Sequence, residues 1–395
     1  MRVGVYAGDF GPEEGGAHTF VSTVLEGFFD LAETSAHEFT VFCEPGHERA
    51  IAARCASAGI SAHALPRRGR IDLLLAEMRH YSPLAWALRN RPGRLQRAAA
   101  GCGIELMWFV PGLAYEALDI PYIGTIWDLQ HRLLPWFPET CADGYWEHRE
   151  LVYSRFIRRA CHLLTGTRTG AELIARLYGV APERISVLPQ PVPRIEAGSP
   201  PAAVGAGSGE PYILYPAQFW AHKNHVNLLH ALKLLEERDG LRVAAVFPGA
   251  DKGTLEHVRR TCAALALQGR VRFPGFVSAG ELSALYRGAA ALVYPSFNGP
   301  DNLPPLEAFA HGCPVAISDY PGAEEQTGEA AVRFAPDRPE EIARAVKRIL
   351  TEEGLRARLV ARGSARAAGW SAQDYARGVL EVVDRLEPLR RTWSA

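Results

Sequence analysis

The sequence predicts an α/β protein made of two doubly wound domains, each with a parallel sheet covered by helices on both faces. Short apolar runs alternate with longer helical patterns, and this alternation occurs once in each half of the chain. The apolar runs are nearly continuous, as in strands that are buried on both faces. Between the halves lies a stretch without periodicity, residues 196–211, rich in Gly, Pro, Ala and Ser, which indicates a linker.

The first domain is expected over residues 1–195. Its helical patterns include residues 18–31 and 145–160. Its predicted strands are residues 3–6, 39–42, 104–108, 122–126, 162–164 and 185–188.

The second domain is expected over residues 212–370, with helices such as 225–237 and 255–267. A last helix, residues 374–386, is expected within a terminal segment, 371–395. The predicted strands of the second domain are residues 212–215, 243–247, 271–273, 290–294 and 315–317.

The composition is that of an ordinary soluble globular enzyme, with 395 residues, 48% hydrophobic and 22% charged. A net charge of -1 argues against a global attraction to nucleic acid or lipid. The sequence contains no run of 18 apolar residues, so it predicts no membrane span. The start of the chain has no signal-peptide pattern. The seven cysteines are scattered without a CxxC pair, which favours reduced thiols and a cytoplasmic protein.

Ligands of doubly wound sheets bind at the carboxyl ends of the strands, so the loops there are the candidates for chemistry. The loop after residues 212–215 reads PAQFWAHKNHVNLLHAL, with Lys223 and Asn224 at the mouth of a helix. Helix-start amides and a lysine together attract anions, which favours a diphosphate clamp. The alternative is a solvated lysine beside an asparagine cap.

Two other loops contain glycines that would let the backbone approach a ligand. In PGFVSAGEL, Gly275 allows a close approach while Phe276 and Val277 flank a flat base; the alternative is a turn into a capped helix. After the first strand, Gly15 and Gly16 precede a helix. Their loop is a candidate for passing close to a sugar or phosphate, although its sequence is not GxGxxG.

The stretch YPSFNGPDNLPPLEAFAHGCPVAIS, residues 294–318, places Glu307 in the first turn of a helix that begins near Pro304. The positive helix start favours the ionised carboxylate, which can accept from both hydroxyls of a ribose. The alternative is a glutamate that only supports the helix dipole.

Asp128 and His131 directly follow residues 122–126, in TIWDLQHRLLPWFPE. Either side chain is a candidate for contacts near the acceptor or the reacting sugar. The alternative is structural, because a lone histidine more often completes a folded interior.

The order of these pieces resembles the family 4 glycosyltransferases of the GT-B fold, most strongly over residues 212–336, where LPPLEA…G.PV is highly specific. The resemblance implies two Rossmann-like domains facing across a cleft, with the C-terminal helix returning to the first. It implies that Lys223 binds the donor diphosphate, Glu307 the ribose, and the turn at Gly275 the base through its backbone. It also implies a retaining, metal-independent transfer, with a nucleotide diphosphate sugar of UDP or GDP type as substrate and no separate cofactor.

Three positions depart from the family pattern. Gly299 stands where E-x7-E has its first acid, Gln218 where an arginine is common, and Trp127 where a histidine precedes the aspartate. The loop GPDNLPP resembles a sub-group with a polar pair, so Asp301 and Asn302 become candidates for holding the donor sugar; the alternative is a plain turn. The resemblance adds Gln218, Asn224 and Leu303 to the donor site.

The expected reaction moves a hexose-type sugar to a glycan, lipid-linked or small-molecule acceptor, as in cell-surface polysaccharide assembly. Lys223 and loop amides would stabilise the leaving diphosphate, since no DxD-type metal site is evident. The alternatives are an inactive sugar-nucleotide-binding partner protein and a GT-B sugar-nucleotide epimerase.

Residues 67–97 form a basic segment with eight arginines and two acids, interleaved with apolar residues. One interpretation is a peripheral contact with the anionic inner face of the membrane, where a lipid-linked acceptor would wait. The alternative is a helix pair with a solvated arginine face. The arginines are Arg67, Arg68, Arg70, Arg79, Arg89, Arg91, Arg94 and Arg97.

Overall fold

The computed structural model describes residues 1–9, 11, 15–67, 69, 93–112, 118–194, 211–299 and 301–393. The chain forms two compact units. Unit 1 comprises Met1–Leu129, Gly144–Pro191 and Ser371–Ala395, and unit 2 comprises Gln130–Asp143 and Val192–Trp370. The short segment Gln130–Asp143 lies within the first expected domain, residues 1–195, but groups with unit 2. Residues 196–210 of the expected linker lie outside the described residues.

Within its described residues, unit 1 has a parallel sheet of seven strands in the order β3-β2-β1-β4-β5-β6-β7. The sequence pattern missed only the edge strand β3, because its SAHA sequence has no apolar run and is mostly exposed. The strands are β1 (Arg2–Tyr6), β2 (Glu38–Cys43), β3 (Ser61–Ala64), β4 (Leu106–Phe109), β5 (Tyr122–Thr125), β6 (His162–Thr165) and β7 (Ile185–Val187).

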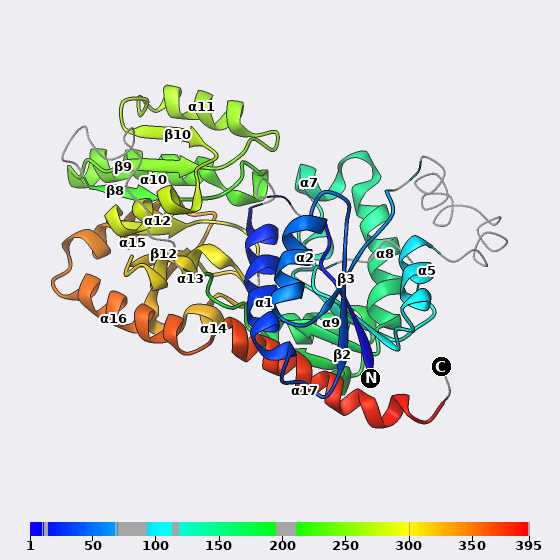
Figure 1. The fold of residues 1–395 in the computed structure, drawn as a ribbon. Coiled ribbons are helices and arrows are strands. Elements are labelled where there is room, and N and C mark those ends of the chain that lie inside the picture. The colour runs from blue at the N-terminus through cyan, green and yellow to red at the C-terminus, as the bar shows by residue number, and fades with distance from the viewer. Residues whose placement is uncertain are drawn as a thin grey trace. The chain divides into compact units, whose positions relative to one another are not determined.

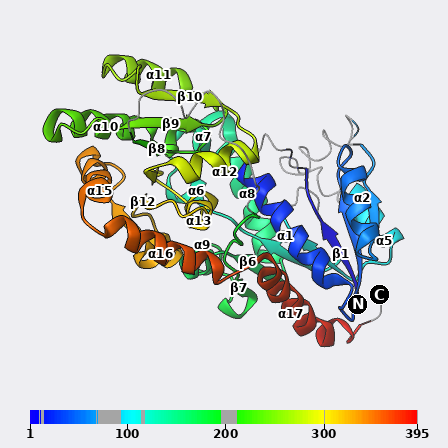
Figure 2. The same ribbon diagram turned by 60° about the vertical axis from the view of Figure 1, so that its left-hand side comes forward.

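The C-terminal helix α17 packs along α1 in unit 1, as Figures 1 and 2 show in red and blue. Gly27 permits this close approach, because a Cβ there would lie 2.3 Å from the backbone of Ala372. The expected return of the C-terminal helix to the first domain is therefore confirmed. The helices are α1 (Gly16–Ala32), α2 (Glu48–Ser57), α5 (Arg94–Gly101), α8 (Tyr145–Arg159), α9 (Arg168–Tyr178) and α17 (Ala372–Arg390).

Unit 2 has a parallel sheet of six strands over its described residues, in the order β10-β9-β8-β11-β12-β13. The edge strand β13 was not predicted from sequence, since its four residues alternate and include an exposed arginine. The strands are β8 (Tyr212–Leu214), β9 (Ala244–Pro248), β10 (Val271–Gly275), β11 (Ala291–Tyr294), β12 (Val315–Ser318) and β13 (Ala331–Phe334).

Helices cover the unit 2 sheet, with α10 packed against α15 and α13 against α16. Gly363 on α16 allows the second contact, because a Cβ there would lie 2.6 Å from the ring of Phe309. The helices are α6 (Gln130–Leu133), α7 (Pro138–Cys141), α10 (His225–Asp239), α11 (Leu255–Ala264), α12 (Ala279–Gly288), α13 (Leu303–Ala310), α14 (Ala323–Thr327), α15 (Pro339–Thr351) and α16 (Leu355–Ala368).

Each sheet has a switch point, where the strand order runs outward in both directions. It lies between β1 and β4 in unit 1 and between β8 and β11 in unit 2. The carboxyl ends of strands at such a point are the usual ligand site of doubly wound sheets. In unit 2, the loops that leave β8 and β11 carry Lys223 and Asn302, respectively.

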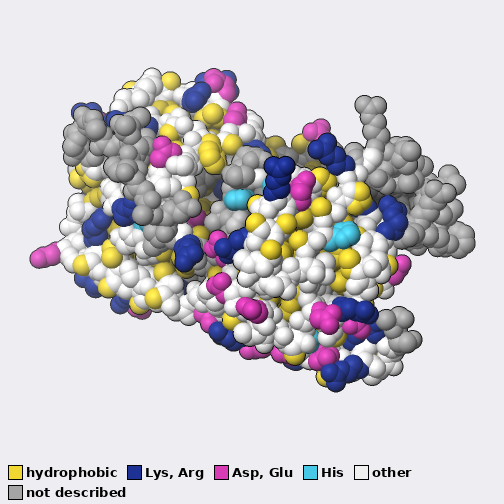
Figure 3. All heavy atoms as spheres, in the orientation of Figure 1, with side chains coloured by type: hydrophobic (Ala, Val, Ile, Leu, Met, Phe, Trp, Pro, Cys, Tyr) yellow, Lys and Arg dark blue, Asp and Glu magenta, His cyan; other side chains and the backbone are white. Residues whose placement is uncertain are grey.

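The surface in Figure 3 carries charges of both signs, in keeping with the net charge of -1. On α17, for example, Arg377 pairs with Asp374 at 2.6 Å and Arg391 with Glu387 at 2.7 Å. Among the described residues, no helix combines the length and the apolarity needed to cross a membrane. Residues 68 and 70–92, most of the predicted basic segment, lie outside the described residues.

Candidate functional site at the carboxyl edge of the unit 2 sheet

Asn224 shapes the loop after β8. Its φ of 62° is left-handed, which asparagine tolerates better than most residues, and this bend separates the 3₁₀ turn Ala221–Lys223 from α10. Its side-chain amide donates to the carbonyls of Pro295 at 2.9 Å and Pro336 at 2.7 Å. Asn224 therefore fixes the position of the turn, and its amide nitrogen is used within the protein.

The ammonium of Lys223 points to the ring of Tyr294. The Nζ atom lies 3.0 Å from the Tyr294 hydroxyl and 5.4 Å from the ring centroid. The Lys223 carbonyl accepts from the Tyr215 hydroxyl at 2.7 Å, which anchors the backbone. In the described part of the chain, no carboxylate forms an ion pair with Lys223. Its positive charge is thus held in place without being neutralised.

Tyr294 connects the lysine to the loop after β11. Its hydroxyl donates to Oδ1 of Asn302 at 2.7 Å, and the Asn302 amide donates to the Gly299 carbonyl at 2.8 Å. Lys223 and Asn302, two residues predicted separately from sequence, are therefore joined through one phenol. In the sequence, Tyr294 stands out only by its place at the end of an apolar strand.

The structure explains why Gly299 carries no side chain. Its φ is 137°, and a Cβ at this position would lie 2.1 Å from Nδ2 of Asn302. Real Cβ atoms do not approach other atoms so closely, so an acid at 299 requires Asn302 to move. The sequence prediction that Asn302 takes over a role from position 299 has this steric counterpart: the amide occupies the space beside the glycine.

Asp301 is held from α14. Its Oδ1 accepts from the amide of Gln326 at 2.7 Å, and the same amide donates to the Asn302 carbonyl at 2.7 Å. The Tyr320 hydroxyl in turn donates to Gln326 Oε1 at 3.2 Å. Leu303, the first residue of α13, is buried. The sequence reading named Asp301 and Leu303, but Gln326 and Tyr320 lie too far along the chain to have been associated with them.

Glu307 lies farther into α13 than predicted. The helix begins at Leu303, so Glu307 is its fifth residue and lies beyond the first turn. The expectation that the helix start favours its ionised form was wrong. Burial instead raises the pKa of Glu307, although a hydrogen bond from the Tyr286 hydroxyl to Oε2, 2.7 Å long, partly lowers it.

Tyr286 is itself fixed by His311. The two rings stack with centroids 5.2 Å apart, and His311 bonds the Glu307 carbonyl at 2.7 Å and the Ser283 hydroxyl at 3.0 Å. The carboxylate of Glu307 therefore has one oxygen in a rigid contact. No described residue donates to Oε1, the other oxygen.

The turn at the end of β10 leads into a capped helix, which is one of the two interpretations that the sequence left open. Gly275 has a φ of 75°, and Phe276 is 65% exposed. Val277 precedes Ser278, which caps α12 in a reciprocal capping box with Glu281. The turn into a capped helix is therefore present, and it carries an exposed aromatic ring.

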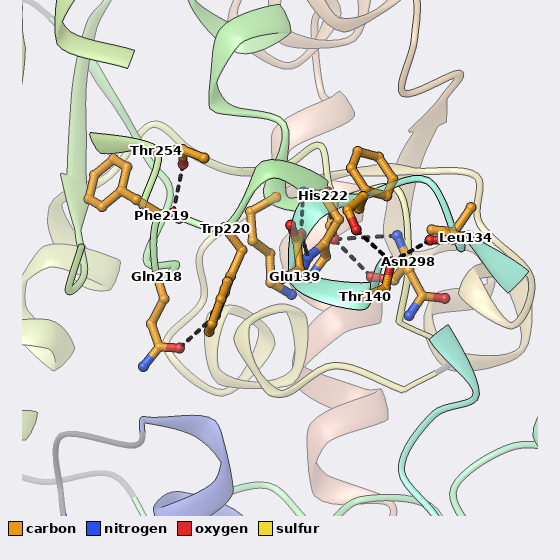
Figure 4. A network of polar contacts seen from close by, with 12 residues as sticks. Leu134, Glu139, Thr140, Gln218, Phe219, Trp220, His222, Thr254 and Asn298 are labelled. Atoms are coloured by element: carbon orange, nitrogen blue, oxygen red, sulfur yellow. Dashed lines mark hydrogen bonds and ion pairs between the residues drawn. The ribbon is translucent and has the colours of Figure 1, made fainter. Parts of the chain in front are cut away.

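Gln218 lies in the loop after β8, and His225 is the first residue of α10. Gln218 accepts from the indole of Trp220 at 3.0 Å (Figure 4). His225 is buried between aromatic rings and stacks on Phe219 with centroids 4.4 Å apart. Burial, together with the nearby charges of Lys223 and His222, lowers the pKa of His225 to about 3. His225 is therefore neutral and cannot replace a missing arginine charge.

A carboxylate that the sequence did not single out also reaches this loop. Glu139 on α7 contacts His222, the residue before Lys223, and Figure 4 shows the two side chains meeting. Phe137 packs on Phe297 with centroids 5.5 Å apart, so α7 and the loop after β11 also touch.

Asp128 and His131, the two candidates that follow β5, have different surroundings. Asp128 accepts from Arg149 at 2.7 Å, and Arg149 is in turn 2.9 Å from the Tyr153 hydroxyl. His131 is fully buried on α6, which groups with unit 2. These two residues, predicted together from their spacing, thus belong to different units.

Gly15 and Gly16 stand at the start of α1, where Gly15 has a φ of 61°. Residues 10 and 12–14 of the glycine loop lie outside the described residues. Throughout the described ranges, no group of three or more His, Cys, Asp or Glu side chains could hold a metal ion.

Part of the chain matches a known protein family. Residues 201–366 match the model of the family described as Glycosyl transferases group 1. This segment, which includes the whole unit 2 sheet, is therefore similar to that family.

Two curated relatives extend the comparison. The chain is 30% identical over 203 residues to an O-antigen chain mannosyltransferase, RfbU, of Salmonella typhimurium, covering 50% of this chain and 55% of that protein. It is 29% identical over 227 residues to a D-inositol 3-phosphate glycosyltransferase of Streptomyces bingchenggensis, covering 53% and 50%. The chain thus spans about half the length of these curated relatives.

Solved structures show the same fold over nearly the whole chain. A sucrose-phosphate synthase from Thermosynechococcus elongatus superposes with a TM-score of 0.72 at 16% identity, covering 98% of this chain and 100% of that one. Anabaena HepE in complex with UDP and glucose gives a TM-score of 0.66 at 14% identity, covering 98% and 100%. The protein has a GT-B-like fold, as the sequence predicted.

Proposed function

We propose that the protein is a retaining glycosyltransferase that moves a hexose from a nucleotide diphosphate sugar to an acceptor. One observation carries the proposal. At the switch point between β8 and β11, the un-neutralised ammonium of Lys223 is joined through Tyr294 to Asn302. This edge offers a fixed positive charge beside polar groups on the neighbouring loop, which suits a diphosphate that carries a sugar.

The leaving nucleotide diphosphate gains negative charge as the sugar departs. A donor already fixed in position stabilises that charge without rearranging during the reaction. The partner of Lys223 is a hydroxyl and not a carboxylate, so this contact orients the ammonium without forming an ion pair. The family match over residues 201–366 supports the same assignment for the segment that contains these residues.

The ribose is assigned to Glu307. Tyr286 holds Oε2, and Oε1 is left to accept from a ribose hydroxyl. Glu307→Gln should reduce nucleotide affinity about tenfold, the equivalent of about 1.4 kcal/mol, because the amide presents a weaker acceptor. The matched probe is a 2′,3′-dideoxynucleotide diphosphate, which should bind wild type and variant equally. If the dideoxy compound binds wild type as tightly as the normal nucleotide, the ribose assignment is wrong.

The donor sugar is assigned to the loop at Asp301 and Asn302, and the base to the turn at Gly275, Phe276 and Val277. Relatives named as mannosyltransferases and a fold relative named as a complex with UDP and glucose support a hexose donor. Relatives named for O-antigen chains support an acceptor in polysaccharide assembly.

A thermal-shift panel of UDP, GDP, ADP and their monophosphates tests the nucleotide class. Tight binding raises the melting temperature, with about 2.7 kcal/mol of stabilisation at a hundredfold excess over the dissociation constant. We expect UDP or GDP to stabilise the protein more than its monophosphate does. No shift with any diphosphate would contradict the proposal.

The contacts of Asn302 favour a second candidate function. In this case the protein would bind sugar nucleotides without transferring the sugar. Both ends of the Asn302 amide are bonded inside the protein, to Tyr294 and to the Gly299 carbonyl. Release of UDP or GDP from UDP-glucose or GDP-mannose by the purified protein separates the two candidates. Binding of the nucleotide without turnover, with acceptor glycans present, would favour the second.

A further inference from the structure

Glu139 reaches the candidate site from a distant part of the chain. It lies on α7 in Gln130–Asp143, the segment that belongs to unit 2 although its neighbours on both sides belong to unit 1. Its Oε1 accepts from the backbone N–H of His222 at 2.8 Å and also contacts Nδ1 of the His222 ring (Figure 4). The two side chains are only 8% and 9% exposed, so the contact is shielded from solvent.

His222 lies within the 3₁₀ turn Ala221–Lys223, and this turn needs an acceptor for its backbone N–H groups. The first N–H groups of a helical turn have no acceptor within the turn, and a carboxylate there satisfies one of them. Other contacts hold the carbonyl side: the N–H of Phe297 donates to the His222 carbonyl at 2.9 Å, and Tyr215 to that of Lys223. Glu139 thus supplies the acceptor at the beginning of the turn that presents Lys223.

The carboxylate is itself held rigidly. The Thr140 hydroxyl closes the α7 turn by contacting the carbonyls of Leu134 and Phe137, each at 2.8 Å (Figure 4). Phe137 packs against the rings of Phe297 and His222. Burial alone would raise the pKa of Glu139, but the hydrogen bonds from His222 outweigh it and lower the pKa. The group is therefore an ionised, acceptor-only carboxylate at neutral pH, and Nδ1 of His222 must carry the proton between them.

We propose that Glu139 is a positioning residue of the phosphate clamp, which fixes the turn that carries Lys223 by holding the backbone and ring of His222. The inference rests on the proposed function, because it assumes that Lys223 binds the donor diphosphate. It gives the segment Gln130–Asp143 a role at the nucleotide side of the protein. It also explains how a single lysine can be held firmly enough to act where Gln218 provides no charge.

The test is a double-mutant cycle with Lys223, with UDP and GDP as probes and UMP and GMP as controls. Glu139→Ala should weaken binding of the diphosphate about tenfold, the equivalent of about 1.4 kcal/mol, and leave the monophosphate nearly unchanged. In a Lys223→Ala background the same substitution should cause little further loss, since residues that act through one group are not additive. Glu139→Gln should recover part of the affinity, because its Oε1 can still accept from the His222 N–H.

Glu236→Ala is the matched control for lost stability. Glu236 is also an acid of unit 2 bonded to a buried cation, Arg270, at 2.7 Å, but it lies near the far end of α10. Its removal should lower the melting temperature without changing affinity for UDP or GDP. The inference is overturned if Glu139→Ala binds diphosphate as tightly as wild type, or if its loss of diphosphate affinity equals that of Glu236→Ala. It is also overturned if the loss in the double mutant equals the sum of the separate Glu139→Ala and Lys223→Ala losses. Failure of wild type to bind either diphosphate would instead overturn the proposed function, and the inference with it.

Discussion

The two units place charged residues at the same kind of sheet edge but treat them differently. In unit 1, Glu44 follows β2 and pairs with Arg94, and Asp128 follows β5 and pairs with Arg149. In unit 2, Lys223 follows β8 and contacts the hydroxyl of Tyr294 instead of a carboxylate. The architecture of the sheets is alike, so the difference lies in the loops. A doubly wound sheet offers a place for a ligand at this edge, and the two units differ in whether the charged loop residue there already has a charged partner.

In each of the two unit 1 ion pairs, the charge of one side chain is neutralised by the other. The side chains of Arg94 and Glu44 are 3% and 4% exposed, and such a buried pair is costly to break because removing one partner leaves a charge without water. A cation whose charge is neutralised by a carboxylate in this way attracts a phosphate only weakly. The ammonium of Lys223 is oriented by a phenol and forms no ion pair among the described residues, and our proposal gives it the anion of a ligand as a partner.

Gly299→Glu should cause the largest change, because it attacks the unit 2 edge directly. The new side chain needs the place of the Asn302 amide, so we expect catalytic efficiency with the donor that the wild type uses to fall at least about 100-fold, or about 2.7 kcal/mol. Gly253→Glu is the matched control: it also has a positive φ, 103°, but a Cβ there meets nothing within 4 Å. Equal activities of the two variants would show that Asn302 need not stay where it is.

Lys223→Ala comes next. A charge-assisted contact contributes about 1.5–3 kcal/mol, so diphosphate affinity and turnover should both fall about 10- to 150-fold. Lys233→Ala, on α10 and paired with Glu236 and Glu237, is the control and should change little. A wild-type catalytic efficiency in Lys223→Ala would remove the contrast between the two edges.

His225→Phe should change how the stability of the protein depends on pH. Because the folded pKa of about 3 lies below the ordinary value of about 6.5, the unfolded chain binds the proton more readily between these pH values. The wild type should therefore lose about 2 kcal/mol of unfolding free energy between pH 6.5 and pH 5 from this group alone. The variant should show a flatter decline in urea unfolding over that range. Parallel curves would mean that His225 accepts a proton in the folded state.

Asp128→Asn tests the unit 1 side and should have the smallest effect. Asp128 is 27% exposed, so we expect about 1 kcal/mol of lost stability, discounted for solvent screening, with nucleotide affinity unchanged. Thermal unfolding and UDP or GDP titration measure the two effects separately. A large loss of turnover with normal stability would make Asp128 a catalytic group after all.

The predicted and observed folds agree where the signal is local. Apolar runs predicted the central strands, and the terminal helix pattern predicted α17. The edge strands β3 and β13 were missed because polar or exposed residues interrupt their short sequences, so neither forms a continuous apolar run. The segment Gln130–Asp143 was assigned by its position in the chain to the first domain, whereas its contacts group it with unit 2.

The sequence by itself determined which residue types follow which strand, and so it named Lys223, Asn302 and Glu307. The predictions for Lys223 and Glu307 depend on periodicity and turn chemistry, which act over a few neighbouring residues. The prediction for Asn302 depends on the resemblance of its loop to a family sub-group. The partners of these residues could not be named in this way. Tyr294 is 71 residues from Lys223, Tyr286 is 21 from Glu307, and Glu139 is 83 from His222. Only the folded chain decides such pairings, because a hydrogen bond needs two atoms within about 3 Å, and packing across the sheet brings them there.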